Sequence, residues 1–205
     1  MAVRITHFSD TLCVWAFLGH RRVEELIEQY GDDIEIETRY CSVFPDAWSK
    51  IVDKWGADDG FEAFGRHLHK VAADFPHISL HPDLWQTARP RSSSAPHLYL
   101  KAVQLIEDAN LPWRARLSTR ADWAMRRAFF EEARDISDWS VLDAVLEETG
   151  IDPEAVAKRI RSSEAVARLA ADYHLCGQLG ITGSPTLVLN EGRQTLFGNV
   201  GYRLI

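Results

Sequence analysis

The first forty residues constrain the fold of this chain most strongly, because a strand, a helix and a second strand follow one another there. Residues 3–8, "VRITHF", and residues 34–40, "IEIETRY", alternate between apolar and polar side chains as strands do. Between them, "CVWAFLGHRRVEELIEQYG" has apolar residues at helical spacing and ends on Gly31, a favoured helix C-cap. This unit predicts two parallel strands joined by a crossover helix.

The rest of the chain separates into a long helical zone and a short strand zone. Residues 58–178 are predicted to be helical almost throughout, since successive segments carry apolar stripes and several follow a capping Ser or Asp. After Gly180, "PTLVLN" and "QTLFG" flank the short turn "EGR" and predict an antiparallel hairpin. The expected α/β fold is therefore β-α-β, a large all-helical insertion, and β-β.

Composition and charge narrow the classes of function. The chain has 205 residues, 46% of them hydrophobic, and a formal net charge of −7, which argues against a nucleic-acid or anionic-membrane surface. No segment is apolar enough for a signal peptide or a membrane span. The three cysteines are too few and scattered for a disulfide framework or a zinc site, and no histidine pair has an acidic or cysteine cluster beside it. We expect a soluble protein of the reducing cytoplasm without a bound metal.

Cys13 stands where the first strand ends and the helix begins, in "FSDTLCVWAFLG". The first turn of a helix has unpaired N–H groups and the positive end of the helix dipole, and both stabilise a thiolate. A reactive thiol with a pKa below that of a free cysteine is one interpretation. A small buried hydrophobe is the other, and spacing alone does not separate the two.

The order of elements and two motifs resemble a known family. Cys13 at the head of the first helix and "GITGSPT" before the third strand are similar to the thioredoxin-like proteins of the DsbA family. "CVWAFLG" resembles the "CPWCYLG" of its cytoplasmic FrnE-like branch, and "RAFFEEARDIS" and "ARPRSSSAPHLY" resemble segments of the insertion in that branch. The resemblance extends over nearly the whole chain.

The resemblance implies a thioredoxin-like fold with a helical insertion. The thioredoxin-like domain would be discontinuous, formed by residues 1–57 and 179–205, and residues 58–178 would form the insertion domain. Related proteins end with a further helix, whereas this chain ends with "GNVGYRLI". We therefore expect that helix to be truncated or reduced to its first turn.

The resemblance also assigns the site residues. Cys13 would be the catalytic thiol, and Pro185 would have a cis peptide bond beside it. That geometry would leave the backbone of Ser184 free to pair with an extended substrate. Trp15 lies within the motif, so it would line the substrate groove, although simple packing explains it equally well.

Ala16 is where the sequence departs from the family pattern. Dithiol members have at that position a second cysteine that attacks the mixed disulfide and releases the substrate. Ala16 lacks a thiol, so the chain has no CxxC redox cycle. Cys41 and Cys176 lie outside the place of a resolving thiol in this fold, and we interpret both as structural.

Chemistry with a single thiol is what remains. Cys13 would exchange with a thiol or disulfide substrate, small molecule or peptide, with glutathione or another low-molecular-weight thiol as co-substrate and no tightly bound cofactor. A second hypothesis is a glutathione-dependent transferase or isomerase of the kappa or 2-hydroxychromene-2-carboxylate isomerase type, which lacks the second cysteine and holds glutathione near the cis-proline. A third is a redox-inactive binding module. The sequence leaves a homodimer open.

Overall fold

Four strands form one sheet in the computed structural model, which describes residues 2–201. The strands are β1 (Val3–Ser9), β2 (Ile34–Tyr40), β3 (Thr186–Leu189) and β4 (Gln194–Phe197), in the order β2-β1-β3-β4. β1 pairs in parallel with β2, while β3 is antiparallel to both β1 and β4. The predicted crossover unit and hairpin are confirmed. The expectation for a C-terminal helix falls partly on residues 202–205, outside the described residues.

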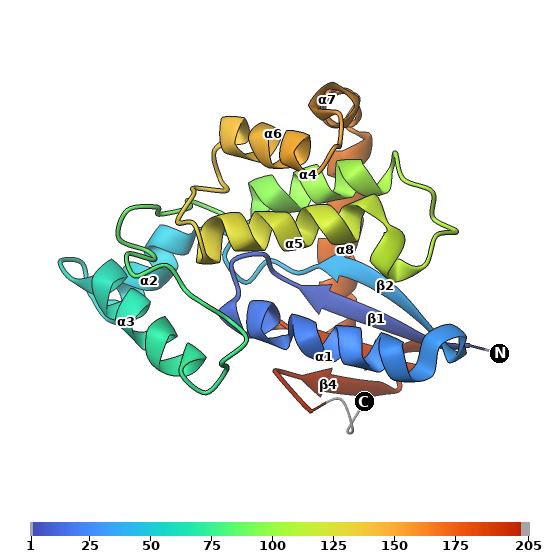
Figure 1. Cartoon of the computed structure of the whole chain (residues 1–205), viewed down its shortest axis with the longest axis horizontal. Helices are drawn as coiled ribbons and strands as arrows, with labels where there is room; N and C mark the ends of the chain where they lie inside the picture. The colour runs from blue at the N-terminus through green and yellow to red at the C-terminus, as the bar shows by residue number, and fades with distance from the viewer. Residues whose placement is uncertain (1, 202–205) are drawn as a thin grey trace.

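Seven helices lie between β2 and β3. The seven α-helices are α2 (Ala47–Trp55), α3 (Gly60–Ala72), α4 (Ser94–Gln104), α5 (Leu117–Phe130), α6 (Trp139–Glu148), α7 (Pro153–Arg161) and α8 (Glu164–Leu179). An eighth, α1 (Val14–Tyr30), lies earlier in the chain, between β1 and β2. α4 packs against α5, α7 and α8 and is the centre of the helical layer, while α2 and α3 pack together at the end of the molecule where α1 begins (Figure 1). The fold is thus thioredoxin-like with a helical insertion, and the residue boundaries of its two parts stay a prediction.

The alternation of side chains along the strands decides which helix covers which face of the sheet. Ile5 packs with Val23 of α1, whereas Phe8 packs with Cys176 of α8. Because odd and even positions of a strand point to opposite faces, α1 and α8 cover the two sides of the sheet. In Figure 1, α1 lies in front of β1 and α8 runs behind it.

Local sequence signals fix several helix ends. The side chains of Asp138 and Asp152 accept hydrogen bonds from the main-chain N–H groups of Ser140 and Glu154, as expected of N-caps. Gly180 ends α8 in the left-handed conformation with φ of 65°, which a residue with a Cβ adopts less readily. α8 therefore stops close to the loop that leads to β3.

No helix within residues 2–201 is both long and apolar enough to cross a membrane. Over the same residues, no group of three or more histidine, cysteine or acidic side chains is arranged to hold a metal ion.

Candidate active site

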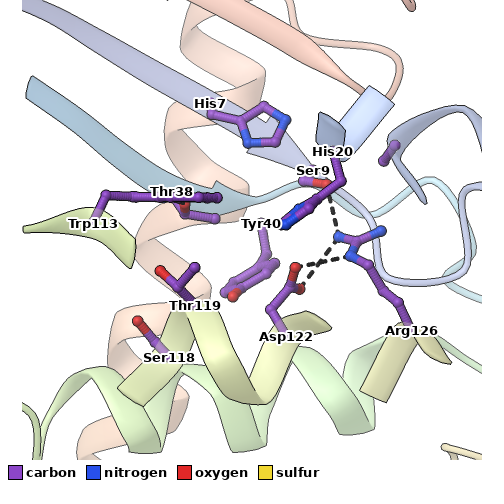
Figure 2. A pocket seen from close by; sticks show the side chains of 11 residues that line it. His7, Ser9, His20, Thr38, Tyr40, Trp113, Ser118, Thr119, Asp122 and Arg126 are labelled. Carbon is purple, nitrogen blue, oxygen red and sulfur yellow. Dashed lines mark hydrogen bonds and ion pairs between the residues drawn. The ribbon is translucent and has the colours of Figure 1, made fainter. Parts of the chain in front are cut away.

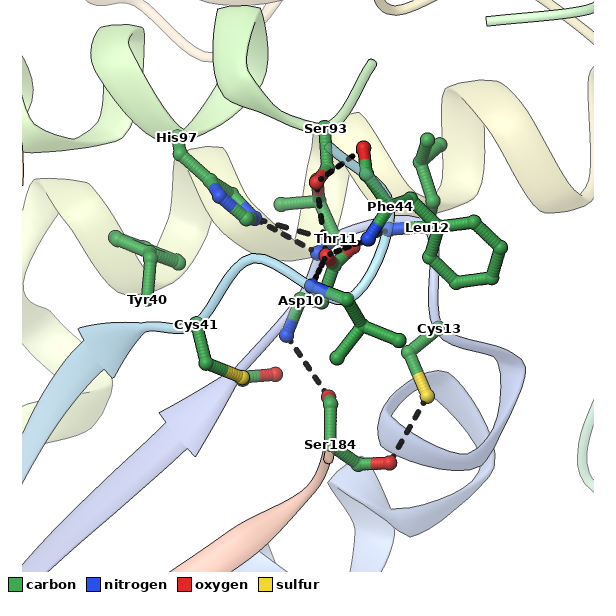
Figure 3. A network of polar contacts seen from close by, with 12 residues as sticks. Asp10, Thr11, Leu12, Cys13, Tyr40, Cys41, Phe44, Ser93, His97 and Ser184 are labelled. Atoms are coloured by element: carbon green, nitrogen blue, oxygen red, sulfur yellow. Dashed lines mark hydrogen bonds and ion pairs between the residues drawn. The ribbon is translucent and has the colours of Figure 1, made fainter. Parts of the chain in front are cut away.

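Cys13 is the N-cap residue of α1, and its main chain is still extended where the helix begins. Its Sγ atom donates a hydrogen bond to the main-chain carbonyl oxygen of Ser184, with 3.0 Å between sulfur and oxygen (Figure 3). The side chain is 6% exposed. The structure therefore brings the candidate thiol directly against the loop before β3.

That loop contains the Ser184–Pro185 peptide bond, which is cis. The Oγ atom of Ser184 accepts a hydrogen bond of 2.8 Å from the main-chain N–H of Asp10. Both polar oxygens of this serine are thus engaged, one by the turn before α1 and the other by the thiol. A substrate that pairs with the Ser184 carbonyl would share this oxygen with the thiol or displace the thiol from it.

Asp10 organises the turn between β1 and α1, a role that the sequence did not reveal. Its fully buried carboxylate accepts hydrogen bonds from the main-chain N–H groups of Leu12, Val43 and Phe44 and from the hydroxyl of Ser93. An aspartate just after a strand often accepts from the N–H two residues on, which is the one local signal available. The three other bonds come from distant segments, so this carboxylate ties the insertion to the start of α1.

His97 of α4 supports the same turn from the other side. Its Nε2 atom accepts a hydrogen bond of 3.1 Å from the main-chain N–H of Thr11, so Nδ1 carries the proton and donates it to the hydroxyl of Tyr173 at 3.0 Å. Burial lowers the pKa of His97 to about 4. The ring is therefore neutral near pH 7, and its 4.0 Å approach to Asp10 is not an ion pair.

The electrostatics of Cys13 differ from the sequence expectation. Burial raises the pKa of the Cys13 thiol, and the main-chain N–H groups of Ala16 and Trp15 in the first turn offset that effect only in part. The nearby Asp10 carboxylate acts in the same direction as burial. The prediction of a pKa below that of a free cysteine is wrong, because burial destabilises the thiolate more than the N–H groups of the helix terminus stabilise it.

An open groove with a volume of about 290 Å³ lies over Cys13. Of the three residues predicted to bind substrate, Trp15 and Ser184 line this groove together with the thiol, whereas Pro185 does not. Trp15 is 41% exposed and also contacts Phe75 edge to face, with ring centroids 6.3 Å apart. Trp15 therefore has both predicted roles, since one edge of the ring packs against Phe75 and the side chain also forms part of the groove wall.

Ala16 and Pro185 lie on a different side of the first turn from the groove. Both line a small cavity of about 20 Å³, together with His7. The side chain of Ala16 is buried, and its main-chain N–H donates a hydrogen bond of 3.1 Å to the carbonyl oxygen of Cys13. The position of the missing second thiol is thus occupied by a buried methyl group that does not line the groove.

A buried ion pair closes the space behind Ala16. The guanidinium of Arg126 on α5 bonds to the Asp122 carboxylate at 2.8 Å and donates to the hydroxyl of Ser9 (Figure 2). It also donates to the main-chain carbonyl of Asp10. A residue that is 2% exposed can hold such a charge only with its donors satisfied. Arg126 therefore fixes the end of β1 against the insertion.

Cys41 and Cys176 are free, buried thiols near the end of β2 at Tyr40. They pack with Phe8 and Val188, and their Sγ atoms approach the carbonyl oxygens of Gly183 and Tyr40, at 3.8 Å and 3.7 Å. Burial raises the pKa of both, to about 11 for Cys176. Neither lines the groove over Cys13.

Comparison with known proteins places this architecture. The sequence profile described as "DSBA-like thioredoxin domain" matches residues 4–205. Among curated proteins, no sequence relative of the chain was found.

Solved structures give a similar result. A protein from Streptomyces coelicolor described as a probable DsbA oxidoreductase is 20% identical and superposes with a TM-score of 0.74 over 98% of this chain and 86% of its own. The cytosolic disulfide reductase DsbM of Pseudomonas aeruginosa is 19% identical, with a TM-score of 0.68 over 95% and 89%, and was also solved with GSH. A 2-hydroxychromene-2-carboxylate isomerase is 17% identical, with a TM-score of 0.65 over 96% and 89%. At these identities the likeness shows the fold.

Proposed function

The chain belongs to the family of DSBA-like thioredoxin domains, and from that premise we propose that it is a thiol–disulfide oxidoreductase working through one cysteine, Cys13. The observation that carries the proposal is the position of the thiol. It lies in an open groove against the carbonyl of Ser184, with Ala16 in place of a second cysteine. The groove gives a substrate sulfur access to Cys13 and to no other thiol among the described residues.

The proposed cycle has two exchange steps. The Cys13 thiol loses its proton and attacks one sulfur of a substrate disulfide, forming a mixed disulfide and releasing the other half of the substrate as a thiol. A glutathione molecule then attacks the mixed disulfide, restores the Cys13 thiol and leaves with the remaining half as a glutathione mixed disulfide. One half of the substrate is thereby reduced to a thiol, and the glutathione sulfur is oxidised as it takes the place of that half in the remaining disulfide.

The raised pKa of Cys13 is compatible with this reductive direction. A stabilised thiolate makes a cysteine pair strongly oxidising, because the reduced form is then favoured. Burial at Cys13 does the opposite and destabilises the thiolate. The free enzyme would therefore attack slowly at neutral pH, and its thiol lacks the thiolate stabilisation that makes such cysteines strongly oxidising.

Two structures of one neighbour support the choice of thiol and direction. This neighbour is named a cytosolic disulfide reductase, and the same protein was solved with GSH. The proposed cycle needs a pool of reduced thiol, so we place this chain in a reducing compartment such as the cytoplasm. Its three cysteines are free, as such a compartment would keep them.

A glutathione-dependent transferase or isomerase is the second candidate. The Cys13 thiol is held protonated and already donates a hydrogen bond, so it could donate instead to the sulfur of a bound thiolate. A structural neighbour is named 2-hydroxychromene-2-carboxylate isomerase. In this alternative, glutathione binds without forming a bond to Cys13.

Glutathione adduct formation separates the two candidates. We expect wild-type protein exposed to oxidised glutathione to gain one glutathione on Cys13, and to reduce hydroxyethyl disulfide in the presence of glutathione. Cys13→Ser should lose both properties, because a hydroxyl forms no mixed disulfide, whereas Cys176→Ser should keep them. Circular dichroism of each variant checks the fold.

The other outcomes choose between the alternatives. Retention of most activity in Cys13→Ser would overturn the exchange mechanism and favour the transferase or isomerase, since a hydroxyl still donates to a bound thiolate. A wild-type protein that neither forms the adduct nor binds glutathione by calorimetry would be a redox-inactive binding module.

A further inference from the structure

The groove over Cys13 combines aromatic walls with positive charge. Its aromatic walls are Trp15, Phe44, Trp55, Phe64 and Phe197. Its charged lining consists of Lys50 and Lys54 of α2, with His67 of α3 beside them, and no aspartate or glutamate lines it among residues 2–201. The chain as a whole has a net charge of −7, so the sign of this groove is opposite to that of the molecule.

Lys50 and Lys54 are one helical turn apart and so project from the same face of α2. The Lys50 ammonium donates to the carbonyl of Val43 at 2.7 Å and lies 4.8 Å from the centroid of the Phe44 ring. An ammonium has three donors, so this bond leaves others for a ligand. Neither lysine has a carboxylate within 4.0 Å among the described residues.

The carboxylates of α2 and its N-cap do not cancel this charge in the groove. Asp46 accepts from Ser49 and pairs with Arg91 at 3.1 Å. Asp53 is on the same helix but does not line the groove. An anion between the aromatic walls would therefore meet two ammonium groups directly.

We propose that the groove selects disulfides and thiols that carry a carboxylate on an aromatic or other apolar body, with Lys50 and Lys54 binding the carboxylate while the sulfur reaches Cys13. The inference rests on the proposed function, because it concerns the same groove. It adds the substrate class, which excludes cationic disulfides and disfavours neutral ones. The aromatic walls bind the apolar body, and the lysines supply the preference for negative charge.

Two aromatic disulfides of similar shape test the preference. Dithiobis(nitrobenzoate) carries a carboxylate on each ring, and dithiodipyridine is neutral at pH 8. In both reactions the Cys13 thiol loses its proton, forms a mixed disulfide with one aryl sulfur and displaces the other as an aryl thiolate. The pyridine thiolate then takes up a proton on its ring nitrogen and becomes a thiopyridone, and the absorbance of the released product is followed in each reaction. Cys13→Ser protein gives the background from the other two thiols.

We expect the double variant Lys50→Gln, Lys54→Gln to react about three- to tenfold more slowly with dithiobis(nitrobenzoate), and much less changed with dithiodipyridine. The neutral reagent is essential, since removing two positive charges also makes the thiolate of Cys13 less stable. That effect slows both reactions equally, and the ratio of the two rates removes it. Lys158→Gln, an exposed lysine on α7, is the matched control for charge and should leave the ratio unchanged.

Each other outcome overturns a defined statement. An unchanged ratio in the double variant, or an equal change in Lys158→Gln, overturns the carboxylate selection and leaves the exchange function intact. If Cys13 of the wild-type protein reacts with neither disulfide, the exchange function fails, and the selection fails with it. Added salt should lower the ratio of the dithiobis(nitrobenzoate) rate to the dithiodipyridine rate in the wild-type protein, since screening weakens the attraction of the lysines for the carboxylate.

Discussion

The main-chain N–H of Asp10 donates a hydrogen bond to the Oγ atom of Ser184 at 2.8 Å, across 174 residues of sequence. The same serine accepts the thiol of Cys13 through its carbonyl. One residue therefore holds both the end of β1 and the candidate nucleophile. The position of the thiol relative to the proline loop depends on this link as much as on α1.

Ser184→Ala should destabilise the fold measurably. The variant leaves the buried N–H of Asp10 without its acceptor, which costs about 1–3 kcal/mol of unfolding free energy. Urea unfolding at pH 7 measures the loss. Ser162→Ala, at an exposed serine, is the control and should cost less. Equal losses in the two variants would show that the Asp10–Ser184 bond contributes nothing beyond that of a surface serine.

Alkylation of Cys13 should be slow at neutral pH. Because burial raises the pKa of this thiol, the reactive thiolate is scarce at pH 7, and its fraction should still be rising above pH 9, the usual value for a thiol. Iodoacetamide labelling between pH 6 and pH 10, followed by peptide mass spectrometry, measures the rate for each cysteine. Cys13 should be labelled before Cys41, which is 2% exposed and does not line the groove.

A rate for Cys13 that reaches its plateau at or below pH 7 would contradict this expectation. It would mean that the first turn of α1 stabilises the thiolate more than burial destabilises it.

Local patterns in the sequence were enough to predict the framework of the site. The alternation over residues 3–8 and 34–40 gave the two parallel strands, and the apolar spacing between them gave α1. The position of Cys13 at the start of that helix, where the structure has it as the N-cap, follows from the same patterns. These features are predictable because each depends on residues within one element.

The environment of Cys13 was not predictable in that way. The depth of the thiol depends on a carbonyl 171 residues away, and the Asp10 carboxylate is bonded to groups 33 and 83 residues further along. Lys50 and Lys54 have the spacing of an ordinary solvated helix face. Only the packing of α2 and α3 over the thiol turns that spacing into a charged groove.

Two buried histidines should make the fold sensitive to acid. Burial lowers the pKa of His7 and of His97 to about 4, from 6.5. Between these values the unfolded chain binds protons that the folded chain does not, so stability is complete above pH 6.5 and falls as the pH drops towards 4. The loss is on the order of 3 kcal/mol for each histidine at pH 4.

Urea unfolding at pH 7 and at pH 4.5 measures this loss. His7→Leu should reduce the difference between the two pH values, because the unfolded variant has one histidine fewer to protonate. His174→Gln, at an exposed position of α8, should leave the difference unchanged. An unaltered difference in His7→Leu would assign the acid sensitivity to other groups, such as the buried carboxylates.

Ala16→Cys should restore the missing half of the redox motif. Residues 13 and 16 share the first turn of α1, where the main-chain N–H of Ala16 bonds to the Cys13 carbonyl at 3.1 Å, so the two thiols can approach within disulfide range. An internal thiol at a high effective concentration resolves the mixed disulfide faster than free glutathione does. Turnover with a disulfide substrate should therefore rise at least about tenfold above wild type.

The control for this gain is Ala16→Ser, which adds a group of similar size without a thiol. A loss of two hydrogens by intact mass spectrometry, absent from the serine variant, shows that the new disulfide forms. The new side chain would line the same small cavity as His7. If the disulfide forms and turnover does not rise, the groove is unsuited to thiol exchange. The oxidoreductase function would then be overturned, because both thiols would be present and reactive while the groove does not bind a disulfide substrate productively.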